Sequence, residues 1–149
     1  MQKITRLSQI LSIKEQATNK ARDALLQAQN HFNKTKNQHS QLINYRQDYL
    51  QQISDIGNQG CTISKMRNRV NFISEVDRAL MQLNQRLSDI ASQRKNHEKD
   101  YLHAKAEEEA LKSLISRLKI QEQRRQDKLE QKEMDEYAAK QWYSKKKKQ

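Results

Sequence analysis

The side chains that most often carry chemistry in proteins are few in this sequence and poorly spaced for it. Histidines four residues apart share a helix face and can bind a metal ion together, but His97 and His103 are six apart. Cys61 is the only cysteine, which excludes cysteine-rich zinc sites and any internal disulfide. The sequence therefore predicts no metal site, and Cys61 is expected to be an unreactive loop thiol.

Two other patterns that could support catalysis also fail. Glu107, Glu108 and Glu109 are consecutive, so on a helix they spread around its circumference and predict a solvated surface instead of an acid–base pair. The stretch GNQG at 57–60 contains the only two glycines of the chain, too few for a phosphate-binding loop. We therefore expect no catalytic residue, no cofactor and no enzyme activity.

The composition favours long helices over a globular core. Only 34% of the 149 residues are apolar and 32% are charged, and the net charge is +11. Disorder has a similar signature, but the chain has no proline and is rich in helix formers such as Gln, Lys, Glu and Leu. No stretch approaches the ~20 apolar residues of a membrane span, and no secretory signal is present. A cytoplasmic protein is expected.

Two apolar stripes with the alternating spacing of three and four residues that is typical of coiled coils flank the glycines. The first runs from Ile4 to Ile56 and the second from Met66 to Leu118, and eleven and twelve of their sixteen positions are apolar. A few polar residues interrupt the stripes and are expected to set the register of packing or to loosen it. They include Lys14, Thr18, His39, Arg94 and His97.

These stripes predict an all-α fold, a long antiparallel two-helix coiled-coil hairpin in a single domain over 1–149. The expected parts are a helix at about 4–56, a turn at 57–61, a second helix at about 62–141 and a basic tail at 142–149 that frays. Gly57 is expected to end the first helix in a left-handed conformation, and Thr62 or Ser64 to cap the second. A bend near residue 59 would place Ile4 beside Ile115. Residues after about 118 would then have no partner within the chain, and we call the C-terminal part that contains them, residues 116–149, the overhang.

Apolar and aromatic side chains border the stripes near the expected bend. Gln38, Tyr45, Phe72 and Ala79 occupy the flanking position before the stripe, where coiled coils usually carry charge. In an antiparallel pair these flanks share one side, so exposed apolar surface there predicts a protein contact. A hairpin in which Tyr45 and Phe72 only widen the core remains the alternative.

The overhang is basic. Residues 116–149 contain eleven positive and six negative side chains, and the chain ends in the lysine run KKKK at 145–148. Such a run is usually a solvated tail, and attraction to nucleic acid or anionic lipid is the next interpretation.

Three segments of the sequence resemble one known family. They are LINYRQDYL at 42–50, the GNQG turn followed by NRVNF at 68–72, and QKEMDEYAA at 131–139. Together they are similar to the FliJ family of flagellar type III export proteins, nearly from end to end. The resemblance implies an antiparallel coiled coil like the central stalk of rotary ATP synthases. It also implies binding to the hexameric ATPase FliI and the export-gate protein FlhA, with links to FliH and export chaperones.

The resemblance also implies which residues make these contacts. Val76 and Leu83 depart from the family pattern, which has leucine and histidine at those positions. The implied FlhA contact comprises Gln38, Leu42, Tyr45, Tyr49, Phe72, Val76, Ala79 and Leu83. The implied FliI contact, in the overhang, comprises Gln131, Lys132, Met134, Asp135, Glu136 and Ala138.

Our functional hypothesis from the sequence is a noncatalytic stalk or adaptor of flagellar protein export, acting in bacterial motility and chemotaxis. It would couple FliI to FlhA in the cytoplasm, bind no nucleic acid and reach the inner membrane only through its partners. One alternative is the equivalent stalk of a virulence injectisome. Another is a basic coiled coil that binds nucleic acid or a membrane surface.

Overall fold

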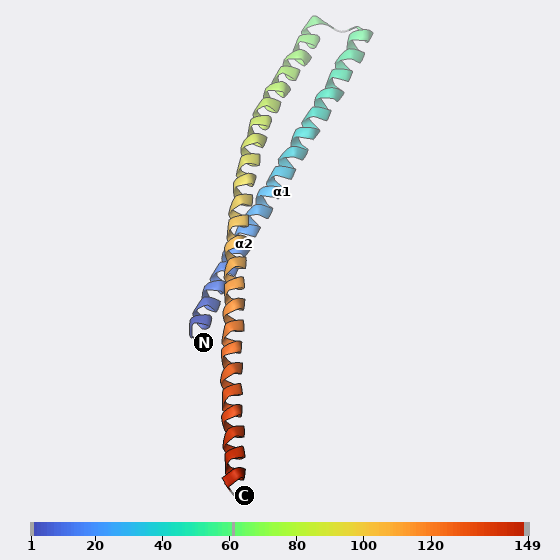
Figure 1. The fold of residues 1–149 in the computed structure, drawn as a ribbon. Coiled ribbons are helices and arrows are strands. Elements are labelled where there is room, and N and C mark those ends of the chain that lie inside the picture. The colour runs from blue at the N-terminus through green and yellow to red at the C-terminus, as the bar shows by residue number, and fades with distance from the viewer. Residues whose placement is uncertain (1, 61, 148–149) are drawn as a thin grey trace. The chain divides into compact units, whose positions relative to one another are not determined.

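The computed structural model describes residues 2–60 and 62–147. It contains two helices, α1 (Gln2–Gln59) and α2 (Ile63–Lys147), and no strand among these residues (Figure 1). The helices pack against each other as a hairpin with unequal arms, which confirms the predicted all-α fold class. Cys61, the expected loop thiol, lies outside the described residues.

The bend between the helices begins three residues later than the sequence suggested. Gly60, and not Gly57, has the left-handed backbone, with φ of 86°, and its N–H donates to the Gly57 carbonyl at 3.4 Å. The expectation for Gly57 is therefore wrong, because a helix can continue through one glycine at a cost of about 1 kcal/mol and gains hydrogen bonds by doing so. The hydroxyl of Thr62 accepts from the Lys65 N–H at 3.3 Å, which confirms Thr62 as a cap of α2.

Both apolar stripes form the contact between the helices. All sixteen positions of each stripe, polar ones included, are buried or half-buried. The buried apolar side chains of the described residues are Ile73, Val76, Ile90 and Ile115, which are 4 to 8% exposed. Burial of a narrow stripe while the rest of each helix stays in water is the pattern that a coiled coil requires.

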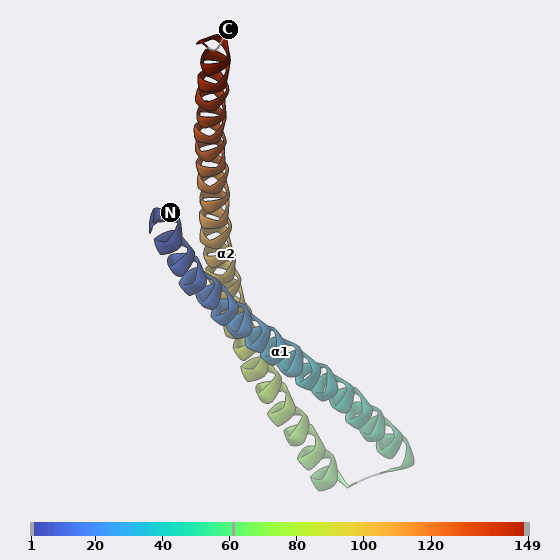
Figure 2. The same ribbon diagram turned by 90° about the horizontal axis from the view of Figure 1, so that it is seen from below.

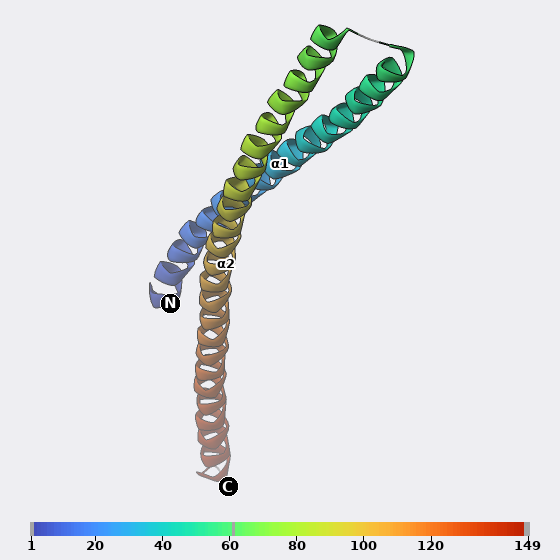
Figure 3. The same ribbon diagram turned by 90° about the horizontal axis from the view of Figure 1, so that it is seen from above.

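The chain divides into two compact units, Asn19–Leu102 and Met1–Thr18 with His103–Gln149. The first unit holds the bend, and Figure 3 shows its parts of α1 and α2 running in opposite directions. Cation–π contacts join them: the Arg94 guanidinium lies 4.4 Å from the Phe32 ring centroid, and that of Arg22 lies 5.7 Å from Tyr101. Arginines in or beside the seam thus pack their flat groups on rings of the other helix.

In the second unit, the start of α1 lies along α2. The Thr18 hydroxyl lies 3.3 Å from the Ala104 carbonyl oxygen, whereas the expected register would place Thr18 beside Tyr101. Ile4 lines the same surface hollow as Leu118 instead of lying near Ile115. The predicted register was therefore wrong by about three residues, and α1 likewise ends three residues after its expected end at about residue 56.

The last part of α2 has no helix beside it in its own unit, as Figures 1 and 2 show in orange to red. Every residue from 127 to 147 is exposed. The helix continues to Lys147, so the expected fraying is wrong for residues 142–147, and residues 148 and 149 are outside the described part. Contacts between residues four apart support these turns: Lys146 Nζ lies 4.7 Å from the Trp142 ring centroid and Lys147 Nζ 5.9 Å from that of Tyr143.

Candidate functional site

Three aromatic rings meet near the bend, in the unit formed by Asn19–Leu102. We call Tyr45, Tyr49 and Phe72 the aromatic patch. Tyr49 and Phe72 lie 4.9 Å apart between centroids, Tyr45 and Phe72 meet edge to face at 6.2 Å, and the two tyrosines stack at 6.4 Å. Each ring pair of this kind contributes about 0.5 to 1.5 kcal/mol beyond its buried area. The patch is therefore a preformed surface built by both helices.

The aromatic patch is also partly in water. Tyr45 is 51% exposed, while Tyr49 and Phe72 are half-buried. Its rings combine apolar surface with two tyrosine hydroxyls, the chemistry that is enriched at the centre of protein interfaces.

An ion pair next to the aromatic patch fixes how α1 faces α2. Arg46 donates from Nε to one carboxylate oxygen of Asp77 at 2.5 Å and from a terminal nitrogen to the other at 3.3 Å. The hydrogen bond to Asp77 raises the pKa of Arg46. A bidentate pair of this geometry holds both the distance and the rotation of the two helices. It thereby supports the register that brings Phe72 to Tyr49.

The structure brings together part of the predicted FlhA contact. Three of the eight residues are exposed, namely Gln38, Tyr45 and Ala79. Four are half-buried, namely Leu42, Tyr49, Phe72 and Leu83, and Val76 is buried. Val76 is only 6% exposed, because its stripe position points it at α1. It can support an exposed surface but cannot itself form much of one.

A polar layer crosses the seam in the unit formed by Met1–Thr18 and His103–Gln149. Thr18 is 1% exposed, and its single hydroxyl proton has two backbone acceptors within reach, the carbonyl oxygens of Lys14 at 3.0 Å and of Ala104 at 3.3 Å. Glu108 is 5% exposed, and Lys112 Nζ lies 3.1 Å from its Oε1. The Thr18 hydroxyl and the Lys112 ammonium hold the pKa of Glu108 below its ordinary value.

A second ion pair flanks this polar layer. Lys14 Nζ donates to Glu107 Oε2 at 2.8 Å, and this hydrogen bond is the main reason that the pKa of Glu107 is lowered. Both groups are more than a third exposed. The layer therefore aligns the helices in the way that polar seam residues set register, as the sequence suggested for Lys14 and Thr18.

The predicted FliI contact residues are all exposed on the overhang. Because α2 is helical there, residues three or four apart share a face. Gln131, Met134, Asp135 and Ala138 consequently lie on one side, and the Gln131 amide donates to Asp135 at 3.1 Å. Lys132 and the residue four positions later, Glu136, lie on another side. A partner that binds only one face of α2 would contact the first four and not these two.

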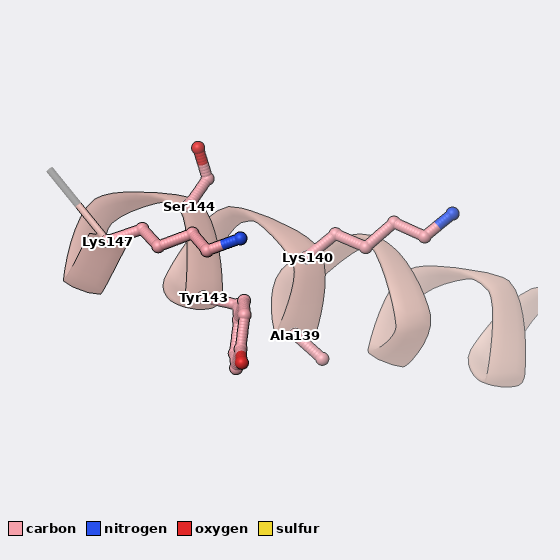
Figure 4. A pocket seen from close by; sticks show the side chains of 5 residues that line it. All are labelled: Ala139, Lys140, Tyr143, Ser144 and Lys147. Carbon is pink, nitrogen blue, oxygen red and sulfur yellow. The ribbon is translucent and has the colours of Figure 1, made fainter.

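Two shallow hollows on the overhang beyond residue 129 have only one wall. Figure 4 shows one of them, which is lined by residues from successive turns of α2 alone: Ala139, Lys140, Tyr143, Ser144 and Lys147. A neighbouring hollow is likewise lined only by side chains between Glu130 and Gln141 of the same helix. Surfaces of this form do not exclude water from a small molecule, as catalytic pockets do.

Within residues 2–60 and 62–147, no group of three or more His, Cys, Asp or Glu side chains is placed to hold a metal ion. Neither described helix contains an apolar stretch that could cross a bilayer.

The fold and these surfaces define a class of protein: an α-helical hairpin that carries a partly exposed aromatic patch near its bend and whose longer helix ends in an exposed stretch with no partner helix in its unit. A family model described as "Flagellar FliJ protein" matches residues 2–147. The chain therefore belongs to the flagellar FliJ family, a non-catalytic component of the flagellar protein export apparatus that works with other export components. No curated protein and no solved structure matches the chain.

Sequence reasoning missed the residues that brace the candidate site. Asp77 was not singled out, although an arginine at a stripe position, Arg46, signals the need for a carboxylate nearby. The pairing of Trp142 with Lys146 was also missed, because residues 142–149 were expected to be frayed. The spacing of four residues between an aromatic ring and a lysine was the available signal.

Proposed function

We propose that this chain is a noncatalytic stalk or adaptor that couples the FliI ATPase ring to the export-gate protein FlhA and assists the passage of chaperones and substrates. The observation that carries the proposal is the partly exposed cluster of Tyr45, Tyr49 and Phe72 beside the Arg46–Asp77 pair. In this proposal the aromatic patch binds the cytoplasmic domain of FlhA, and Gln38, Leu42, Ala79 and Leu83 border the contact.

The overhang supports a separate contact with FliI. It is a single helix that is exposed on all sides from residue 127 to 147, so an ATPase ring can surround it. Gln131, Met134, Asp135 and Ala138 would meet one subunit, and Lys132 and Glu136 another. A helix with charges on several faces can contact a series of similar subunits without requiring one fixed partner.

Further partners and location follow from the same proposal. FliH and export chaperones would join the complex, and the protein would act in the cytoplasm at the inner-membrane base of the flagellum. The family match, which is to the flagellar protein, supports this setting over an injectisome.

The test is a pair of binding measurements on the full chain, one with purified FliI and one with the FlhA cytoplasmic domain. Replacing Tyr45, Tyr49 and Phe72 with alanine should weaken FlhA binding by about tenfold or more and leave FliI binding unchanged. Met134→Ala with Asp135→Ala should do the reverse.

The matched control for the aromatic patch is Met81→Ala, which removes a 75% exposed apolar side chain in the same unit. It should leave both affinities unchanged. Circular dichroism of each variant should show unchanged helicity. Normal FlhA binding by a well-folded aromatic-patch variant would refute the assignment.

A further inference from the structure

The positive charge of the overhang is concentrated at its end. Residues 116–136 contain six positive and six negative side chains, so they are balanced. Residues 137–149 contain five lysines, three aromatic residues and no acidic residue. Glu136 is therefore the last acidic side chain, and all the excess charge of the overhang lies in one short segment.

Aromatic rings and ammonium groups lie side by side on this segment. Trp142 is 61% exposed and Tyr143 is 60% exposed. Tyr137, which precedes them on the same helix, is 65% exposed. Lys146 Nζ lies 4.7 Å from the Trp142 centroid, and Lys147 Nζ 5.9 Å from that of Tyr143. The helix thus presents large amphipathic rings and lysines together over its last two turns.

We propose that the end of α2, residues 137–147, binds directly to the surface of an anionic phospholipid bilayer. Trp and Tyr rings are most favourable at the headgroup level of a membrane, where one side of the ring meets acyl chain and the other meets water. Lysines at the same level are attracted to lipid phosphates. The segment lacks leucine and isoleucine, so it would lie at the interface without entering the acyl region deeply.

Lipid fits this chemistry better than nucleic acid. Proteins that recognise nucleic acid rely heavily on arginine, whose planar group forms paired hydrogen bonds with phosphates and bases. Residues 137–149 contain no arginine, although arginine occurs earlier in the overhang. Lysine, which acts as a point charge, is sufficient to bind a diffuse negative surface such as that of an anionic bilayer.

This contact would go beyond the proposed stalk function. The sequence led us to expect that the protein reaches the membrane only through its partners, whereas this segment would give it a contact of its own. The rings and lysines changed in the test below, Trp142, Tyr143 and Lys145 to Lys147, all follow Ala138, the last residue proposed to contact FliI. Loss of lipid binding would consequently leave FliI and FlhA binding intact, and the two proposals can fail independently.

The first experiment is co-sedimentation of the full chain with vesicles of phosphatidylcholine alone and of phosphatidylcholine mixed with phosphatidylglycerol. Binding is expected only to the anionic vesicles, and it should decrease as salt is raised. Replacing Lys145, Lys146 and Lys147 with glutamine should weaken binding on the order of 100-fold. Trp142→Ala with Tyr143→Ala should weaken it several-fold.

The matched control removes the same charge from the same helix. Lys119, Arg124 and Lys128 are exposed and precede the segment, and replacing all three with glutamine should change binding by less than about threefold, because these groups lie outside the contact. Equal losses in the two triple variants would overturn the proposal, since net charge alone would then explain the binding.

A second experiment uses Trp142, the only tryptophan of the chain, as a probe. Its fluorescence should shift to shorter wavelength on anionic vesicles and be quenched by lipids brominated in the upper acyl chain. Unquenched fluorescence in the bound state would overturn the proposal. So would equal binding to phosphatidylcholine alone, or tighter binding to duplex DNA at the same ionic strength.

Discussion

Arg46 of α1 and Asp77 of α2 are joined by two parallel hydrogen bonds directly beside the aromatic patch. Reversing one charge, in Arg46→Asp or Asp77→Arg, should lower the thermal stability of the hairpin and weaken FlhA binding, because like charges would then face each other. The double reversal, Arg46→Asp with Asp77→Arg, should recover much of the thermal stability and of the FlhA binding. Thermal melts followed by circular dichroism and FlhA titrations measure these effects.

The control for the charge reversal is Asp89→Arg, which places a new positive charge at an exposed position of α2 in the same unit. It should affect FlhA binding little. If the double reversal is as impaired as the single variants, the pair does not set the register near the patch.

The two glycines near the bend should respond oppositely to alanine. Gly57 is helical, and a Cβ there would lie 3.4 Å from the flexible end of Met66, so Gly57→Ala should stabilise by about 0.5 to 1 kcal/mol. Gly60 has φ of 86°, so Gly60→Ala should destabilise by about 1 kcal/mol even though no atom lies within 4 Å of the added Cβ. Urea unfolding of both variants measures the difference. Equal effects would contradict the placement of the left-handed residue at Gly60.

Acid should loosen the unit that contains the polar layer. The folded-state pKa values of Glu107 and Glu108 lie below the ordinary 4.5 because of Lys14, Thr18 and Lys112. A carboxylate whose pKa is lower in the folded state stabilises that state fully at pH values above its pKa in the unfolded chain. This stabilisation is lost as the pH falls through the pKa of the folded state. Stability should therefore decrease below about pH 4.5. Amide hydrogen exchange in residues 2–18 at pH 6 and at pH 3.5, corrected for intrinsic rates, measures this loss of stability.

Glu108→Gln should reduce this pH dependence, while Glu98→Gln, an exposed carboxylate outside that unit, should leave it unchanged. A pH dependence that is identical in the wild type and the Glu108→Gln variant would show that the polar layer is not responsible.

The sequence was sufficient to predict which residues line the seam and which do not. The spacing of apolar residues from Ile4 to Ile56 and from Met66 to Leu118 marks the buried positions, because a helix buries the same face at each turn. The bare overhang followed from the long continuation of the chain past Leu118, where the second stripe ends.

The sequence could not decide where α1 ends. Gly57 and Gly60 are both suitable as a left-handed residue. The choice between them depends on a small difference in free energy, the cost of one glycine inside the helix against the gain from three more helical residues. An error of three residues in the bend shifts every pair across the seam. For this reason the partner of Arg46 could not be named, and Asp77 went unnoticed.

The candidate site was predictable only in part. Heptad positions separate the seam from its flanks, and they placed Tyr45 and Phe72 at an exposed edge. They do not say how far a seam residue remains accessible, and Val76 proved to be buried. The helical end of α2 was missed because contacts such as Lys146 on Trp142 offset the fraying that an isolated helix end undergoes.

The most direct test of the account asks whether one chain can hold FliI and the FlhA cytoplasmic domain at the same time. Sedimentation analysis of the three purified proteins should reveal a complex that contains all three and that does not form when this chain is omitted. The variant with alanine at Tyr45, Tyr49 and Phe72 should retain FliI and lose FlhA. Displacement of FliI by the FlhA domain would contradict the account, because the two partners would then share one surface and the chain could not couple them.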